Sequence, residues 1–214
     1  MRATYVEPAK TPLTFEQAFA AMQQGILVAT GIAPTTAALA LALAKTALET
    51  GRWQSMWNFN WGNVKAADSY EGMFTCYPCN EVIGGKVEWF DPAGALDSRG
   101  GRLVGAGWDV PPGHPQTRFR AYANEFDGAQ QYVDFVANGR YRDAWARLLE
   151  GDAAGYVHAL KLKGYFTADE ATYSKGVESI FREFVTKLET MKTDPAPPLE
   201  PDHLEETQPD VGNS

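Results

Sequence analysis

The chain has 214 residues, of which 44% are hydrophobic and 21% are charged. This length suits one medium-sized domain with its own core, and the composition excludes a collagen-like repeat, a coiled coil or disorder over most of the chain. The formal charge is −8, but six of the 27 acidic residues follow Lys192, where no Lys or Arg occurs. Because the rest is nearly neutral, the chain lacks the basic surface that nucleic-acid binding requires, and we expect no nucleic-acid partner.

Two features of the N-terminal half bear on targeting. Residues 1–20 lack the basic start and apolar run of a secretory signal. The longest apolar stretch, residues 26–48, is interrupted by Gly31 and Pro34 and contains Lys45, so it is not predicted to insert into a membrane.

The only two cysteines, Cys76 and Cys79, exclude a disulfide framework. A thioredoxin-like site would need a helix to follow the pair, and residues 80–85 do not look like a helix start. A zinc site would need four ligands, and only His114 lies in reach by sequence. We therefore expect no metal and no cofactor, and a thiol redox protein built on Cys76 and Cys79 is kept as an alternative.

The elements are predicted in chain order as follows. Residues 1–13 are predicted to form an N-terminal arm. Thr14–Gln17 has the pattern of a capping box and predicts a helix that ends near Thr30. A second helix is predicted from Thr35 to Gly51, and its eight consecutive Ala and Leu residues place it in the middle of the core.

Residues 66–117 are predicted to form a glycine-rich hairpin lobe, with a strand over residues 86–90. Further helices are predicted over residues 126–138, 141–150, 152–163 and 172–191. Residues 193–214 are rich in Pro and acidic residues and are predicted to be a disordered tail. This order of elements indicates an α+β domain over residues 14–192.

Glu49 is the most informative residue, because it lies in the last turn of the apolar second helix. The negative end of the helix dipole and burial beside Trp53 and Trp57 would both favour the protonated carboxyl. A carboxylic acid that keeps its proton near neutral pH is what a glycosidase needs to protonate the leaving oxygen. The alternative is an exposed glutamate at a helix end.

Four segments resemble the motifs of glycoside hydrolase family 73, the N-acetylglucosaminidases that cut bacterial peptidoglycan. Thr46–Gly51 resembles its Ala-Leu-Glu-Ser-Gly motif, although Thr50 replaces the serine. Asn58–Ala66 resembles the family's Asn-rich segment, but it is offset so that Gly62-Asn63 stands where Phe-Gly is usual. Arg118–Tyr122 resembles its Phe-Arg-x-Tyr motif. Leu162–Thr167 with Tyr173 resembles its Gly-Tyr-Ala-Thr-Asp-Pro-x-Tyr segment. The four matches occur in the family's order and span about residues 14–190.

The resemblance implies a lysozyme-like fold, mainly α-helical, with a small β-hairpin lobe beside a substrate cleft. It also implies that Glu49 is the general acid. The second acidic residue of the family is carried by the hairpin lobe, and Glu81 is the closest match, with Glu88 and Glu71 as reserves. Glu81 as a base would stand farther from Glu49 than the ~5 Å of a retaining pair. Assistance by the acetamido group of the substrate remains open.

The same resemblance suggests substrate contacts for Tyr165 and Tyr122. Asn60 is predicted to bind an acetamido group, and Trp61 is a candidate for a sugar subsite, although core packing is expected for two of Trp53, Trp57 and Trp61.

The predicted partner is the glycan strand of peptidoglycan, and a delivery or immunity partner is unknown. Action in the periplasm or cell wall is expected, and without a recognisable signal peptide delivery would depend on a phage or a dedicated secretion route. The alternatives are a lytic transglycosylase or muramidase on the same fold, and a module that binds glycan or a protein partner without cutting.

Overall fold

The computed structural model describes residues 3–83, 85–90, 102–104, 107–110 and 115–193. The tail predicted over residues 193–214 lies outside this part except for Thr193. The helices are α1 Phe15–Thr30, α2 Thr36–Glu49, α4 Glu125–Ala137, α5 Arg142–Glu150, α6 Ala153–Leu162 and α7 Glu170–Thr193. The strands are β1 Thr4–Tyr5, β2 Met73–Cys76, β3 Cys79–Ile83, β4 Lys86–Phe90, β5 Arg102–Val104, β6 Gly107–Val110 and β7 Arg118–Arg120. The predicted α+β class is confirmed.

Local side-chain contacts explain where the first two helices begin. The Thr14 hydroxyl accepts a hydrogen bond from the backbone N–H of Gln17, and the Gln17 side chain accepts one from the N–H of Thr14, which completes the predicted capping box of α1. The Thr35 hydroxyl accepts from the N–H of Ala38 and starts α2. Both predicted starts are therefore confirmed.

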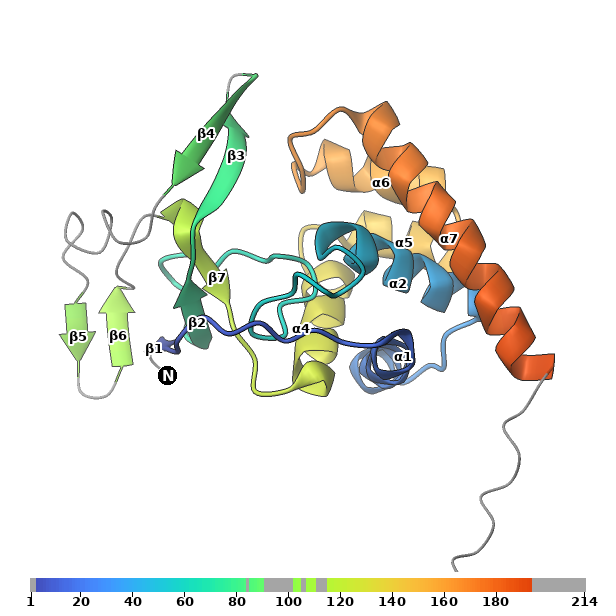
Figure 1. Ribbon diagram of the computed structural model, residues 1–214, viewed down its shortest axis with the longest axis horizontal. Coiled ribbons are helices and arrows are strands. Elements are labelled where there is room, and N and C mark those ends of the chain that lie inside the picture. Colours follow the sequence, from blue (N-terminus) through green and yellow to red (C-terminus); the bar gives the residue numbers. More distant parts are fainter. Residues whose placement is uncertain (1–2, 84, 91–101, 105–106, 111–114, 194–214) are drawn as a thin grey trace, which may run out of the picture.

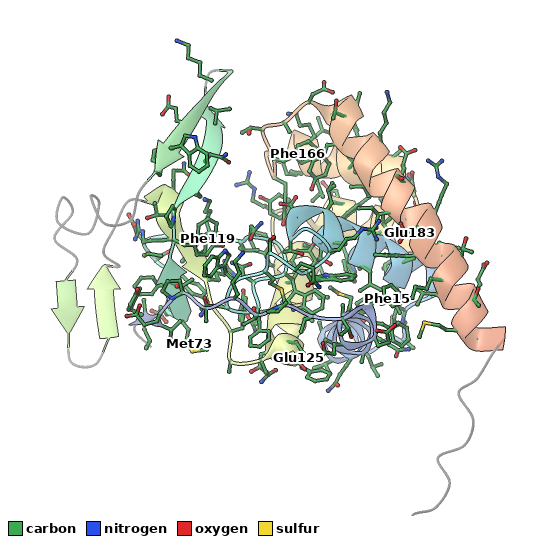
Figure 2. The ribbon with its side chains drawn as sticks, viewed as in Figure 1. Phe15, Met73, Phe119, Glu125, Phe166 and Glu183 are labelled. Carbon is green, nitrogen blue, oxygen red and sulfur yellow. The ribbon has the colours of Figure 1, made fainter. Side chains whose placement is uncertain are left out.

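Helix α2 is the central element of the helical part. Its residues 38–47 are all buried, and it packs against α1, α5 and α7 (Figure 1). Because Ala and Leu surround the helix axis, α2 can be enclosed on every side. Phe15 of α1 lies near α7 in Figure 2, and its ring stands 5.0 Å from that of Phe184. Of the helices in the described ranges, none has the length and hydropathy needed to cross a bilayer.

The strands form a separate lobe. Strand β2 pairs with β1 in parallel and with β7 in antiparallel orientation, so the N-terminal arm is attached to the lobe by β1. Strands β3 and β4 form a hairpin in which Glu81 pairs with Glu88 and Asn80 pairs with Trp89. In Figure 1 this hairpin stands opposite α6 and the beginning of α7. Strands β5 and β6 form a further antiparallel pair.

The loop after α2 has an irregular backbone that side chains hold in place. Five residues without the freedom of glycine have positive φ angles; they are Arg52, Trp53, Asn58, Phe59 and Asn63. Asn60 is 1% exposed and donates to the carbonyls of Val64 and Arg120. Gly128 of α4 is also required here, because a Cβ atom would stand 2.2 Å from the carbonyl oxygen of Phe59. This packing fixes the loop next to the end of α2.

Candidate active site

Glu49 is the last residue of α2, and its side chain is 19% exposed. It lies in a cleft of about 790 Å³ between the helical part and the strand lobe. Phe119 of the strand lobe and Phe166 after α6, both labelled in Figure 2, line opposite parts of this cleft. Among the cleft-lining residues in the described part of the chain, Glu49 is the only one with a carboxylate.

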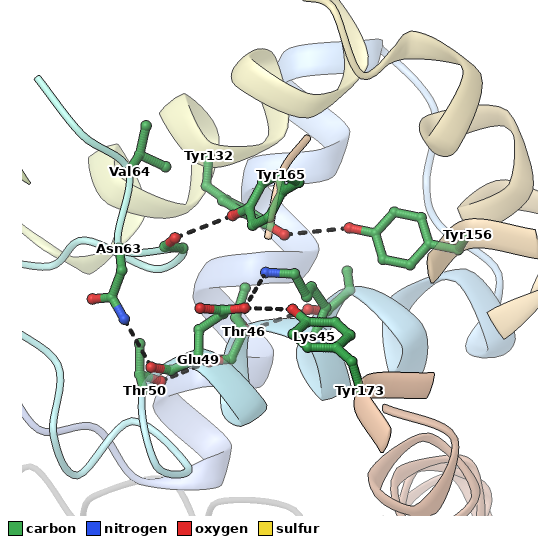
Figure 3. Close-up of polar contacts among 12 residues, drawn as sticks. Lys45, Thr46, Glu49, Thr50, Asn63, Val64, Tyr132, Tyr156, Tyr165 and Tyr173 are labelled. Carbon is green, nitrogen blue, oxygen red and sulfur yellow. Dashed lines mark hydrogen bonds and ion pairs between the residues drawn. The ribbon is translucent and has the colours of Figure 1, made fainter. Parts of the chain in front are cut away.

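Two donors hold one oxygen of the Glu49 carboxylate (Figure 3). The ammonium of Lys45, one helical turn earlier, donates to Oε1 at 2.9 Å. The hydroxyl of Tyr173 in α7 donates to the same oxygen. Because these donors belong to two packed helices, the carboxylate is fixed by the helical part of the molecule.

Lys45 is fully buried, and the structure surrounds its ammonium with aromatic rings. The ammonium lies 4.0 Å from the ring centre of Tyr165 and 5.9 Å from that of Tyr173. Burial lowers the pKa of Lys45, and the neighbouring Glu49 opposes this shift. The site therefore contains a buried amino group whose hydrogen-bond partner is the carboxyl group of Glu49.

The loop after α2 joins the site through two contacts to backbone carbonyls. Asn63 donates from Nδ2 to the carbonyl oxygen of Glu49 at 2.8 Å, which satisfies a carbonyl at the end of the helix. Tyr165 donates from its hydroxyl to the carbonyl oxygen of Gly62 at 3.1 Å. Gly62 must lack a side chain, because a Cβ atom there would stand 2.6 Å from that hydroxyl.

Aromatic side chains form much of the cleft wall on the strand side. The Tyr77 ring stacks on Phe119 at 4.0 Å and on Trp57 at 5.3 Å between ring centres. On the hairpin, Trp89 lines the cleft although it is 74% exposed, and its cross-strand partner Asn80 lines it too. Flat aromatic faces beside polar groups suit a sugar chain.

Two of the predicted site residues, Glu49 and Tyr165, lie together in this cleft. Glu81 occupies a β3 position opposite Glu88, but its side chain lies outside the described part of the chain. Of the two reserves, Glu88 and Glu71 are both exposed, and neither lines the cleft.

The structure places the other three predicted substrate contacts away from the cleft. Trp61 is 0% exposed and donates from its indole nitrogen to the carbonyl of Glu125, so its role is core packing. Asn60 uses its amide to fix the loop. Tyr122 lies outside the set of described residues that line the cleft, and burial raises the pKa of its phenol. Of the three tryptophans after Glu49, Trp53 and Trp61 are buried, and Trp57 lines the cleft.

Lys45 and Tyr173 contact Glu49, although neither was predicted from the sequence to be a site residue. The spacing of Lys45 and Glu49 by four positions in one helix was a usable signal, because such residues are neighbours on a helix surface. Tyr173 belongs to a segment that resembles a family motif, but nothing in the sequence showed that it contacts Glu49, 124 positions away. Cys79 also lines the cleft, and no disulfide joins it to Cys76, whose pKa burial raises to about 11.

No family model matches this chain, and no curated protein matches it. Several solved structures are similar to this chain in fold. A peptidoglycan hydrolase mutant from Sphingomonas sp. A1 superposes with a TM-score of 0.55 at 21% identity, covering 81% of this chain and 99% of that one. A second structure of peptidoglycan hydrolase from the same organism gives 0.53 at 21% identity, covering 85% and 97%. The fold is lysozyme-like. The fold that the resemblance to family 73 implied is thereby confirmed.

Proposed function

We propose that this chain is a peptidoglycan hydrolase that cleaves the glycan strand as an N-acetylglucosaminidase, with Glu49 as the general acid. The observation that carries this proposal is the position of Glu49 in an aromatic cleft of the lysozyme-like fold, where it is the only cleft-lining carboxylate among the described residues. Support also comes from the solved structures of similar fold, which are peptidoglycan hydrolases.

In this mechanism the bond between the anomeric carbon and the glycosidic oxygen breaks, and the electron pair stays on the oxygen. Glu49 gives its proton to that oxygen and becomes a carboxylate. Water then adds to the anomeric carbon and loses a proton to a base. Trp57, Tyr77 and Trp89 line the same cleft as Glu49, and their aromatic faces would pack against the sugar rings.

The base is the second group that the reaction requires. Glu81 remains our proposal, because β3 brings its backbone to the hairpin whose neighbouring pair, Asn80 and Trp89, lines the cleft. Participation of the acetamido group of the substrate is the alternative, and it is favoured by the single carboxylate among the described lining residues.

The deciding experiment is a digest of purified peptidoglycan, with the products identified by mass spectrometry. We expect reducing N-acetylglucosamine ends from the wild type and none from Glu49→Gln. The control is Glu16→Gln, which changes an exposed carboxylate on α1 and should leave the products unchanged. Retention of most of the activity by a folded Glu49→Gln protein would contradict the proposal.

The same digest separates the alternatives. Anhydro-sugar ends would indicate a lytic transglycosylase, and reducing N-acetylmuramic acid ends would indicate a muramidase. Binding to cell walls without soluble products would indicate a non-catalytic module. A large loss of activity in Glu81→Gln, with Glu71→Gln and Glu88→Gln active, would support Glu81 as the base. The substrate would place the activity in the periplasm or cell wall.

A further inference from the structure

The Lys45–Glu49 pair combines a fully buried ammonium with a carboxylate at the edge of a cleft. The side chain of Lys45 is 0% exposed, whereas that of Glu49 is 19% exposed. Placing an ammonium away from water is costly unless a charged partner compensates for it. A lysine at this core position therefore calls for an explanation beyond packing, which an apolar side chain of similar length would provide.

The contacts make the two oxygens of Glu49 unequal. Oε1 accepts hydrogen bonds from Lys45 and from Tyr173. Figure 3 shows the other oxygen turned away from Lys45, and no described residue donates to it. An oxygen that already accepts two donors is the poorer place for a proton, so a proton on Glu49 belongs on Oε2.

We propose that Lys45 is a positioning residue that holds Glu49 by Oε1, leaves Oε2 to carry the transferred proton, and stabilises the carboxylate that remains after transfer. This inference rests on the proposed role of Glu49 as the acid. In the step, the proton on Oε2 moves to the glycosidic oxygen, and the ammonium of Lys45 faces the negative charge that develops on Glu49. A fixed cation in a partly buried site stabilises this developing charge and so lowers the activation barrier of the proton transfer.

The remaining groups that face the pair are phenols. Among the described residues they are Tyr156 of α6, Tyr165 after α6 and Tyr173 of α7, and Tyr132 of α4 lies behind them against Tyr156. Burial raises the pKa of each of them, so they stay neutral at the pH of an assay. Lys45 is thus the cation in contact with Glu49 in the described part of the chain, and removing its charge must favour the protonated acid.

The test compares the full chain with Lys45→Met and Lys45→Gln by measuring kcat/KM on purified peptidoglycan from about pH 4 to about pH 9. Methionine keeps the length without charge, and glutamine keeps a donor without charge. We expect kcat/KM of Lys45→Met to be about tenfold lower than that of the wild type at the optimal pH. The alkaline limb of its plot of kcat/KM against pH should move to higher pH by about one unit. Lys45→Gln should show the same shift of the limb with a smaller loss of rate.

A limb that stays in place in both variants, with the same fractional loss at every pH, would show a purely structural role and overturn the inference. Thermal unfolding confirms that each variant folds, and Lys45→Gln carries the test if Lys45→Met does not fold. The proposed function fails separately, if the wild type releases no glycan fragments or if Glu49→Gln stays active. If the wild type is active and Glu49→Gln is not, a wild-type profile in the Lys45 variants refutes this inference alone.

Discussion

The side chain of Asn63 donates a hydrogen bond from Nδ2 to the backbone carbonyl of Glu49, with 2.8 Å between nitrogen and oxygen (Figure 3). This contact joins the irregular loop after α2 to the end of the helix that carries Glu49, the proposed acid. The last carbonyls of a helix have no partner within the helix, so a side chain from the loop both satisfies one of them and fixes the last residue. Asn63 itself has a φ of 48°, a conformation that asparagine tolerates better than most residues.

We expect Asn63→Gly to lower the free energy of unfolding by about 1 kcal/mol, because the hydrogen bond is lost while the positive φ remains allowed. Activity should fall as well, since Glu49 becomes less well positioned. Urea unfolding and a peptidoglycan assay would measure both effects. Asn138→Ala is the control, because Asn138 is an exposed residue at the end of α4. Equal stability and activity for Asn63→Gly and the wild type would contradict the role of this contact.

The stability of Glu49→Gln should depend on pH through Lys45. Burial places the pKa of Lys45 below its ordinary value of 10.5, and Glu49 opposes the shift. Below 10.5 the folded state therefore binds fewer protons than the unfolded state, and stability rises with pH over the interval between the two values. Without Glu49 the pKa of Lys45 falls further, so the interval widens toward lower pH.

Consequently we expect the free energy of unfolding of Glu49→Gln to be about 3 kcal/mol lower than that of the wild type near neutral pH. As the pH rises, it should increase more steeply than in the wild type. Chemical denaturation at several pH values would measure this. The matched control is the double variant Lys45→Met/Glu49→Gln, which removes the buried amine and should recover most of the stability. A Glu49→Gln protein as stable as the wild type at every pH would show that Glu49 does not stabilise the buried ammonium of Lys45.

Tyr173→Phe should lower kcat about tenfold and leave KM nearly unchanged, because it removes a donor to Oε1 of Glu49 without altering the cleft wall. The Phe side chain keeps the stacking with Phe166, whose ring centre lies 3.9 Å away. Tyr156→Phe is the control, since that phenol meets Tyr132 rather than the carboxylate. An equal fall of kcat in the two variants would show that the hydrogen bond from Tyr173 to Glu49 is not the cause of the loss in Tyr173→Phe.

Trp89→Ala should raise KM several-fold and leave kcat nearly unchanged, because an exposed ring on the cleft wall contributes binding without touching the acid. Folding should be unaffected, since the side chain is 74% exposed. Val87→Ala is the control, because Val87 is also exposed on β4 but does not line the cleft. An unchanged KM in Trp89→Ala would remove the hairpin from the binding surface.

The sequence by itself determined the local elements and the position of Glu49, the proposed acid, at the end of a helix. The capping residues Thr14 and Thr35 fix where α1 and α2 begin, and the run of Ala and Leu residues places α2 in the core. These features depend on neighbouring residues and on helical periodicity, which can be read along the chain. Glu49 could therefore be assigned to a helix end before its surroundings were known.

Only the tertiary structure decided what surrounds Glu49. Tyr173 and Asn63 reach it from another helix and from a loop. Both lie in segments that resemble family motifs, but the sequence did not show that they contact Glu49. The same limit explains the corrections: Trp61 and Asn60 lie in a motif-like segment, but the folded loop buries both side chains, which donate hydrogen bonds to backbone carbonyls. Composition and spacing show which side chains the chain contains, whereas the packing of α2 against α7 and the loop decides which of them contact Glu49.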